Sequence, residues 1–361
     1  MFDVMDSKTR FLSVFSDEGR KKLDRVPTFV QGVLEGFIQE NEEKLFDYSG
    51  KLTYNVRFDA AVCLGFDAVF AGLPSSVTAK PTNIILEDGK EVVVGMGGQL
   101  SKSGTTYYSG GAVKNLDILN KMKENLRIID ASESIKKTIE FYKQVSPIIF
   151  PVPMIGGIFD TVWQAMGFTT FSKNYRKNTK LYREIIKHYA TITKINIEKI
   201  IEATSNQGRI INILDDVAFK GHLMISPERW NQDIGPYYKE IVKIIHDAGM
   251  HAIIHTDGDI TELVPSLINV GFEGLQGWEG GANPEYIADK FPEFVVIGFG
   301  DVGDVLPFGT LKQIEAHVKG LMDALKQNRH YIFGPSTVVF KEMPLENVKY
   351  FVELGKKLGE Y

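Results

Sequence analysis

Apolar runs of strand length alternate along this 361-residue chain with segments whose apolar positions repeat at helical spacing. In the segment 179–204, for example, Leu181, Ile185 and Tyr189 share one helical face. Strands that alternate with helices pair in parallel. Eight of them favour a closed (β/α)8 TIM barrel, with a doubly wound open sheet as the alternative. The eight runs lie near residues 26, 67, 147, 210, 251, 274, 294 and 330.

Two stretches depart from this alternation. A helical pattern at 7–15 precedes the first strand, so we expect an N-terminal helical extension. Between about 81 and 111, the runs 83–86 and 91–94 flank Asp88-Gly89, which is a strong hairpin-turn signal. We predict an inserted β-hairpin there, and a single barrel domain over residues 1–361. Tyr107 and Tyr108 of the insertion either cover the barrel mouth or form an exposed hairpin tip.

Composition narrows the function classes. Hydrophobic residues make up 43% of the chain and charged residues 24%, which is ordinary for a globular protein. The net charge of -5 and the pI near 5.9 disfavour nucleic acid and anionic membrane surfaces as partners. The single cysteine, Cys63, excludes an intrachain disulfide. Together with the lack of a signal-peptide pattern or a membrane-length apolar run, it predicts a cytoplasmic protein.

Polar, chemistry-bearing side chains follow several predicted strands directly. His255 and Asp257 are two residues apart on an extended backbone, so their side chains point the same way. Taken alone, this stretch favours a structural explanation over a site, with Asp257 and Asp259 as turn and helix-cap residues and His255 as a buried histidine. Active sites of α/β barrels lie at the carboxyl ends of the strands, and this shared position favours one site. The residues placed there are Asp215, Asp216, His255, Asp257, Glu279 and Asp301.

Four of these stretches together resemble the uroporphyrinogen decarboxylase superfamily. The resemblance follows the superfamily's order over nearly the whole chain and implies a (β/α)8 barrel. The superfamily contains decarboxylases, which need no cofactor, and methyltransferases that move a methyl group to or from a corrinoid cobalt. The stretches are Asp24-Arg25-Val26-Pro27, Asp215-Asp216 followed by Ser226-Pro227-Glu228-Arg229-Trp230, His255-Thr256-Asp257-Gly258-Asp259, and Leu275-Gln276-Gly277-Trp278-Glu279.

The resemblance is closer to the methyltransferase branch. The arginine-rich segment with which the decarboxylases bind porphyrinogen carboxylates has no counterpart in residues 28–36, and their late histidine would fall near Ser336. Methyltransferases that activate coenzyme M bind zinc through one histidine and two cysteines. The histidine corresponds to His255, but Asp257 and residues 336–337 occupy the cysteine positions. The resemblance therefore does not extend to coenzyme M activation.

We accordingly expect an enzyme that moves a methyl group from a small methoxy or methylamine compound to a corrinoid (cobalamin) cofactor on a separate protein. Zn²⁺ bound by His255, Asp257 and Glu279 is one way to release the methyl group. Acid catalysis by Asp216, Glu279 or Asp215 is the other. The resemblance also implies a homodimer.

Two other functions stay open at this point. One is decarboxylation of a tetrapyrrole or another carboxylated substrate, which arginines at the barrel mouth would favour. The other is a barrel that binds a ligand without catalysis, which side chains of His255, Asp257 and Glu279 pointing apart would favour.

Overall fold

The structure is a computed structural model that describes residues 5–46, 53, 55–86, 89, 91–101, 108–204, 209–219 and 221–361. These ranges contain every predicted barrel strand. They also contain every residue that the sequence places at the carboxyl ends of the strands, which form the rim of the barrel. The turn residue Asp88 and Tyr107 lie outside them, as does the side chain of Tyr108.

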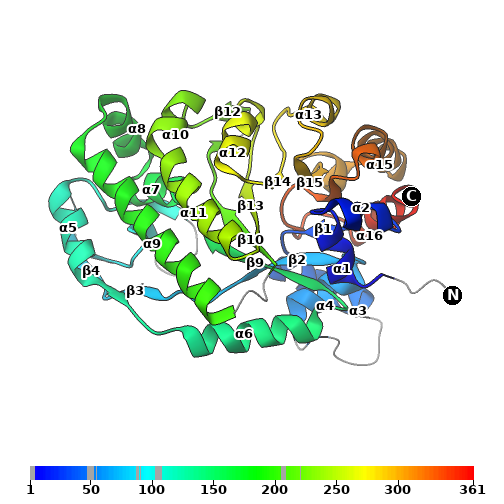
Figure 1. The fold of residues 1–361 in the computed structure, drawn as a ribbon, viewed down its shortest axis with the longest axis horizontal. Coiled ribbons are helices and arrows are strands. Elements are labelled where there is room, and N and C mark those ends of the chain that lie inside the picture. The colour runs from blue at the N-terminus through cyan, green and yellow to red at the C-terminus, as the bar shows by residue number, and fades with distance from the viewer. Residues whose placement is uncertain are drawn as a thin grey trace.

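Eight parallel strands form one sheet in chain order, and this sheet closes on itself (Figure 1). The last strand returns to the first through a parallel bridge between Thr28 and Phe333, and the Phe333 amide donates to the carbonyl of Pro27 at 2.8 Å. The predicted barrel is confirmed, and the open sheet is excluded. The strands are β1 (Phe29–Val30), β2 (Ala68–Gly72), β9 (Phe150–Gly156), β10 (Ile210–Leu214), β13 (His251–Thr256), β14 (Gly274–Gly277), β15 (Val295–Gly300) and β16 (Tyr331–Pro335).

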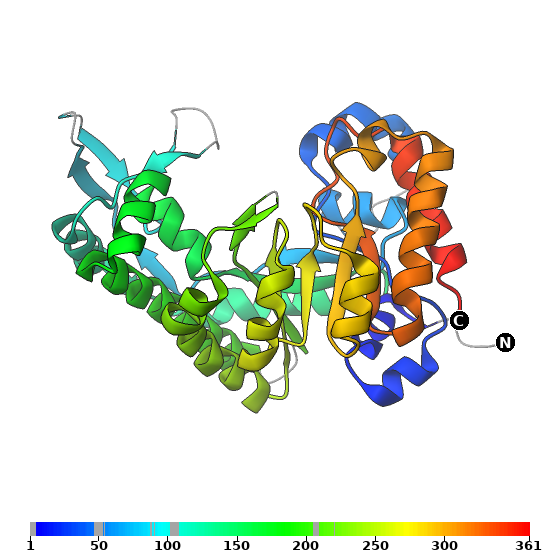
Figure 2. The ribbon, with the colours of Figure 1, turned by 90° about the horizontal axis from the view of Figure 1, so that it is seen from above.

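Helices surround the strands, and two short ones form the predicted N-terminal extension (Figures 1 and 2). The extension is α1 (Ser7–Ser13) and α2 (Asp17–Lys22). The others are α3 (Glu35–Leu45), α4 (Val56–Cys63), α5 (Leu116–Asn125), α6 (Ser132–Val145), α7 (Phe159–Met166), α8 (Phe168–Lys177), α9 (Lys180–Thr204), α10 (Pro227–Asp233), α11 (Gly235–Asp247), α12 (Val264–Val270), α13 (Pro284–Lys290), α14 (Val305–Phe308), α15 (Leu311–Leu325) and α16 (Leu345–Leu358), with 3₁₀ turns at Thr261–Leu263 and Lys326–Asn328.

Side chains alternate between two buried layers along the barrel strands. On β13, Ile254 belongs to the layer packed under the helices, whereas Ile253 belongs to a separate cluster with Phe70 and Ile297 inside the barrel. Because side chains alternate along a strand, His255 points into the barrel with Ile253. The barrel therefore delivers His255 to its interior at the carboxyl end of β13.

An antiparallel excursion interrupts the barrel between β2 and β9. The predicted hairpin is present, with Ile84 opposite Val92, and the excursion is larger than expected because it contains further strand pairs and α5. Figure 2 shows this part extending away from the barrel at one end of the molecule. Its strands are β3 (Val77–Ala79), β4 (Thr82–Ile85), β5 (Glu91–Val94), β6 (Gln99–Ser101), β7 (Tyr108–Gly111) and β8 (Leu126–Ile128), and a separate hairpin of β11 (Ala218–Phe219) and β12 (His222–Leu223) follows β10.

Among the helices that the structure describes, none is both long enough and apolar enough to cross a bilayer.

Candidate metal centre and rim carboxylates

A sharp turn follows His255 at the end of β13. Gly258 has a φ of +89°, and a Cβ at this position would lie 2.9 Å from the backbone nitrogen and oxygen of Phe219. Only glycine fits this turn without strain. Asp259 next to it is a turn residue, because one of its carboxylate oxygens accepts from the amide of Thr261 at 3.0 Å and from its hydroxyl at 2.7 Å.

A hydrogen-bond chain fixes which nitrogen of His255 is available. The Gln276 amide group donates through Nε2 to the carbonyl of Ser336 at 2.7 Å, so its Oε1 faces Nδ1 of His255 and accepts a hydrogen bond from it. The Nδ1 proton of His255 is thereby committed to Gln276. In the neutral imidazole, the lone pair is then on Nε2.

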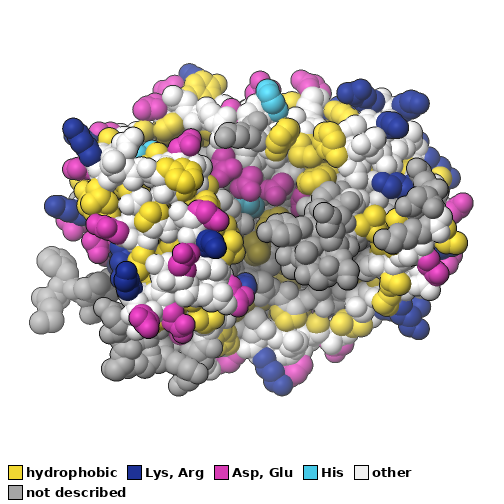
Figure 3. Space-filling view, turned by 180° about the vertical axis from the view of Figure 1, so that it is seen from behind, with side chains coloured by type: hydrophobic (Ala, Val, Ile, Leu, Met, Phe, Trp, Pro, Cys, Tyr) yellow, Lys and Arg dark blue, Asp and Glu magenta, His cyan; other side chains and the backbone are white. Residues whose placement is uncertain are grey.

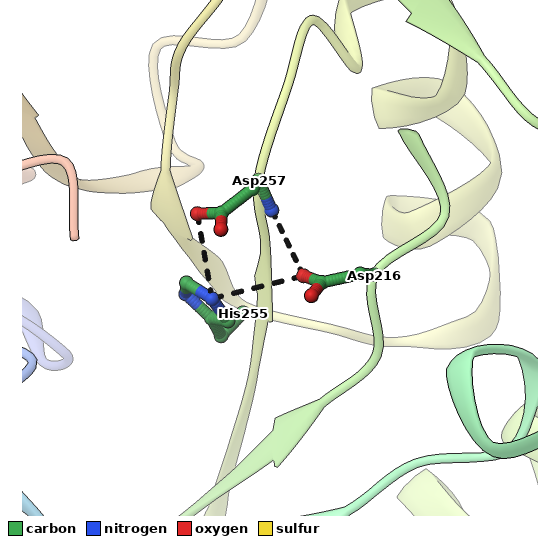
Figure 4. Close-up of side chains that lie close together, drawn as sticks. All are labelled: Asp216, His255 and Asp257. Atoms are coloured by element: carbon green, nitrogen blue, oxygen red, sulfur yellow. Dashed lines mark hydrogen bonds and ion pairs between the residues drawn. The ribbon is translucent and has the colours of Figure 1, made fainter. Parts of the chain in front are cut away.

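Two carboxylates face this nitrogen. The Nε2 atom of His255 lies 3.7 Å from Oδ1 of Asp216 and 3.6 Å from Oδ1 of Asp257 (Figure 4). The Asp257 amide donates to Oδ1 of Asp216 at 3.0 Å, which ties the ends of β10 and β13 together. The three side chains therefore come from two neighbouring strands and point toward one another.

The arrangement matches a metal-binding group. One ligand atom each from Asp216, His255 and Asp257 lies within 4.8 Å of the others. Oδ1 of Asp257 is buried and has no hydrogen-bond partner among the described residues. Burial raises the pKa of Asp257 to about 6. The charges of Asp216 and Glu279 add to this shift and that of His255 opposes it. A divalent cation would give this oxygen a partner and would reduce the repulsion between Asp257 and the neighbouring carboxylates.

Asp215 is fully buried and supports the neighbouring helix. Its carboxylate accepts from the Tyr238 hydroxyl at 2.6 Å and from the Asp160 amide, in the first turn of α7, at 2.7 Å. Burial raises the pKa of Asp215 to about 6, although these bonds oppose the shift. Asp215 therefore positions α7 at the rim beside Asp216.

Asp160 is a rim carboxylate that the sequence analysis did not select. Burial raises its pKa to about 7, with Asp216 and Asp215 adding to the shift and Gln164 opposing it. Nε2 of Gln164 donates to its carboxylate at 2.6 Å. The sequence feature that could have identified Asp160 is its position shortly after a predicted strand, because the other candidate residues also lie just after strands.

Glu279 lies beside this group rather than within it. Its Oε1 accepts from the Ser336 hydroxyl at 2.8 Å, and it is not one of the three residues whose ligand atoms cluster. Asp301 is a turn residue in the structure, which was the alternative to a role in the site. Its Oδ1 accepts from the amides of Gly303 and Asp304, both at 2.8 Å.

Two cavities lie at the carboxyl ends of barrel strands that neighbour β10 and β13. The β14–β15 cavity of about 760 Å³ is lined by Trp278, Glu279, Phe299, Asp301 and their neighbours. The β2–β9 cavity of about 250 Å³ is lined by Met96, Met154, Ile192, Asn196 and their neighbours. No lysine or arginine belongs to the described lining of either one. Figure 3 shows acidic side chains gathered above a histidine in a hollow of this face.

A family model for uroporphyrinogen decarboxylase matches residues 10–358. The chain belongs to the uroporphyrinogen decarboxylase family. The curated proteins contain no match to it.

Among solved structures, this family member is similar to a methyltransferase from Methanosarcina mazei. The TM-score is 0.63 at 18% sequence identity, and the match covers 98% of this chain and 99% of that one. A sugar phosphate isomerase/epimerase from Parabacteroides distasonis matches with a TM-score of 0.40 at 9% identity, covering 92% of this chain and 96% of that one. The likeness to the methyltransferase extends over the whole barrel and concerns the fold.

For this uroporphyrinogen decarboxylase family member, sequence reasoning and geometry agree on His255 and Asp257 as neighbours. The structure adds Asp216 to them as the third member of the cluster, in place of the expected Glu279. Gln276 lies within a family-like stretch, but the sequence alone assigns it no role. The sequence feature that could have identified Gln276 is a polar residue inside a strand next to the strand of His255.

Proposed function

We propose that this protein transfers a methyl group from a small methylated compound to a corrinoid cofactor carried by a separate protein. Asp216, His255 and Asp257 hold a zinc ion at the carboxyl ends of β10 and β13. Family membership and the likeness of the fold to a methyltransferase support this assignment over other barrel functions.

One observation carries the proposal: Nε2 of His255 faces two carboxylates while Nδ1 is committed to Gln276. A histidine held in this way is typical of metal ligands, whose second nitrogen donates to an oxygen acceptor. In His255, Nε2 is directed at the two carboxylate oxygens with which it would share a metal ion.

The donor set fits zinc. One imidazole nitrogen and two carboxylate oxygens are established zinc ligands, and three protein ligands leave a position for substrate. When bound, zinc would act as a Lewis acid on the ether oxygen or amine nitrogen that carries the methyl group.

The remaining rim residues have separate tasks in this proposal. Glu279, outside the ligand group and fixed by the Ser336 hydroxyl, holds the proton for the oxygen or nitrogen that loses its methyl group. Asp215 positions α7 through the Asp160 amide and does not contact substrate. Because Asp216 serves as a ligand, Glu279 is the general acid among the three residues considered for that role.

Decarboxylation of a tetrapyrrole is the less favoured function. Its substrate carries several carboxylates, which need cationic partners when they enter a cavity. The described lining of both rim cavities lacks lysine and arginine, and the rim itself is acidic. This charge distribution would repel such a substrate.

Methyl transfer can be tested directly with purified protein. 2-Methoxyphenol and trimethylamine are each incubated with the zinc-loaded chain and cob(I)alamin, and loss of the cob(I)alamin absorption is followed. We expect demethylation of at least one compound, and a decrease of at least ~100-fold in His255→Ala. His222→Ala, which alters an exposed histidine on the β11–β12 hairpin, is the matched control. Decarboxylation of uroporphyrinogen without demethylation would refute the proposal.

A further inference from the structure

The β14–β15 cavity is the larger of the two rim cavities, and two residues in its wall are connected to the candidate metal centre. These residues are Glu279 and Ser336. The charge of Glu279 contributes to the raised pKa of Asp257. The carbonyl of Ser336 accepts from Gln276, which also accepts from Nδ1 of His255. A molecule in this cavity therefore has the proposed general acid in its wall.

An unusual backbone conformation places two aromatic side chains in the lining. Alternation along β14 and β15 would direct Trp278 into the barrel with Gln276, and Phe299 into it with Ile297. Both aromatic residues instead have a left-handed φ, of +74° and +70°, and belong to the layer packed under the helices. Their rings stack with centroids 5.2 Å apart and line the cavity. Bulky residues rarely adopt this conformation, and those that do concentrate at ligand sites.

The charged side chains in this lining are all acidic among the described residues. Glu279 and Asp301 are half-buried, whereas Glu285 and Asp304 are exposed. His317 also lines the cavity, but it is neutral: its Nε2 accepts from the Asp301 amide at 3.1 Å, and burial lowers its pKa. No described cation in the lining balances the four carboxylates. A cavity whose charges have one sign attracts ligands of the opposite sign, so this one favours a positively charged ligand.

Hydrogen-bond acceptors in the lining are left over for such a ligand. Oδ1 of Asp301 accepts from the turn amides of Gly303 and Asp304, and Oε1 of Glu279 accepts from the Ser336 hydroxyl. The second oxygen of each carboxylate accepts from no residue in the described part of the chain. An ammonium group donates up to three hydrogen bonds and accepts none, so these oxygens suit it. The aromatic rings suit the apolar carbons beside the nitrogen and attract its charge.

The size of the cavity indicates an organic cation and not a second metal ion. Its volume of about 760 Å³ lies within the range of cavities that enclose small organic molecules. A lone metal ion would leave most of this volume unfilled. Metal ions also prefer a shell of polar ligands, whereas Trp278, Phe299 and Leu321 give this cavity apolar walls.

We propose that the β14–β15 cavity binds an alkylammonium group, and that this group belongs to a methyl donor of the methoxy class. The identification of the bound molecule as the methyl donor rests on the proposed function. Glu279 belongs to both the cavity wall and the proposed transfer site, so a donor in the cavity meets its general acid there. A protonated amine has no lone pair to offer a metal, which leaves the ether oxygen of the donor for the zinc.

Three probes with one methoxyphenol body test the charge preference. They are 3-methoxytyramine, 4-(2-hydroxyethyl)-2-methoxyphenol and 4-hydroxy-3-methoxyphenylacetate, whose side chains end in an ammonium group, a neutral hydroxyl and a carboxylate. Calorimetric titration of wild type at pH 7 and low ionic strength, where screening is weakest, measures binding without methyl transfer. We expect 3-methoxytyramine to bind at least tenfold more tightly than the neutral probe, and the carboxylate probe not to bind.

Variants of the lining locate the binding. The double variant Glu285→Gln, Asp304→Asn should bind 3-methoxytyramine at least tenfold more weakly and the neutral probe as before. Gly320→Leu, whose added Cβ would meet no atom within 4 Å in the cavity, should weaken both probes. Glu315→Gln, on the same helix as Gly320 but exposed and outside the lining, is the matched control.

Three results would overturn the inference. They are binding of the neutral or carboxylate probe as tightly as 3-methoxytyramine, equal binding in the double variant and Glu315→Gln, and no binding of 3-methoxytyramine to wild type. The demethylation assay with cob(I)alamin reports separately on the proposed function, because 2-methoxyphenol carries no ammonium group.

Discussion

At the residue scale, one amide decides how the imidazole of the site is used. Gln276 joins the Ser336 carbonyl on one side to Nδ1 of His255 on the other. The i, i+2 spacing was enough to predict that His255 and Asp257 converge. The role of Gln276 was not predictable in this way, because it depends on contacts between strands whose residues are 21 and 60 positions apart.

Replacing this amide should weaken metal binding without unfolding the barrel. In Gln276→Leu, His255 loses the acceptor that fixes its tautomer, so we expect zinc affinity to fall about 10–100-fold. A competitive titration with a zinc-sensitive dye measures the affinity, with the exposed Gln39→Leu as control. Equal affinities in the two variants would contradict the role given to Gln276.

The rim carboxylates predict how stability depends on pH. Asp160 has a folded pKa of about 7 and Asp215 one of about 6, both above the ordinary value of 3.8. A raised pKa stabilises the fold at low pH, and this contribution is lost as pH rises through the folded pKa. Zinc-free protein should therefore lose stability between pH 5 and pH 8.

Asp160→Asn isolates this contribution. The variant cannot ionise at this position, so its stability should fall less between pH 5 and pH 8, by about 1–2 kcal/mol, since water screens part of the interaction. Urea unfolding at several pH values measures the difference. A variant whose pH profile runs parallel to that of wild type would show that Asp160 does not titrate in this range.

At the element scale, the contact between β9 and α7 decides where the rim carboxylates lie. Apolar runs predicted all eight barrel strands, and hairpin-turn chemistry predicted the pair β4 and β5. The short helices α7 and α8 were not predicted. Helix α7 depends on tertiary support for its first turn, which Asp215 provides from a different strand. Such support is not visible in a local pattern.

Two neighbouring glycines at the carboxyl end of β9 test that contact. A Cβ at Gly157 would lie 2.5 Å from Cβ of Asp215 and 2.7 Å from the Tyr238 hydroxyl, whereas one at Gly156 would meet no atom within 4 Å. We expect Gly157→Ala to destabilise the protein by about 2–3 kcal/mol, because close-packed backbone and side chains must shift. Gly156→Ala should be near neutral. Chemical denaturation of both variants measures the difference, and equal stabilities would contradict the packing.

At the scale of the whole molecule, a buried ion-pair network joins the N-terminal extension to the barrel. Asp67 beside β2 accepts from Arg10 of α1 at 2.9 Å and from Arg25 at 2.7 Å, and also from the amide of Thr28 at 2.8 Å. Burial opposes ionisation, but the bonds from Arg25 and Arg10 hold the pKa of Asp67 below its ordinary value. This gives Arg25, part of the family-like stretch Asp24-Arg25-Val26-Pro27, a structural role.

Loss of this carboxylate should be costly. Asp67→Asn leaves two arginines without their buried partner, so we expect a loss of about 3–5 kcal/mol. Asp17→Asn, which alters an ion pair whose Asp17 side chain is 85% exposed, should change stability by less than about 1 kcal/mol. Thermal and urea unfolding measure both. A small effect at Asp67 would mean that the extension contributes little to the barrel.

The zinc content of the purified protein tests the account most directly. Wild type, His255→Ala, Asp216→Ala and His222→Ala are prepared without chelator, supplied with zinc and freed of excess metal before elemental analysis. We predict stoichiometric zinc in wild type and in His222→Ala, and its loss in the other two variants. Equal zinc in wild type and His255→Ala, or none in any of them, would contradict a metal centre at the ends of β10 and β13.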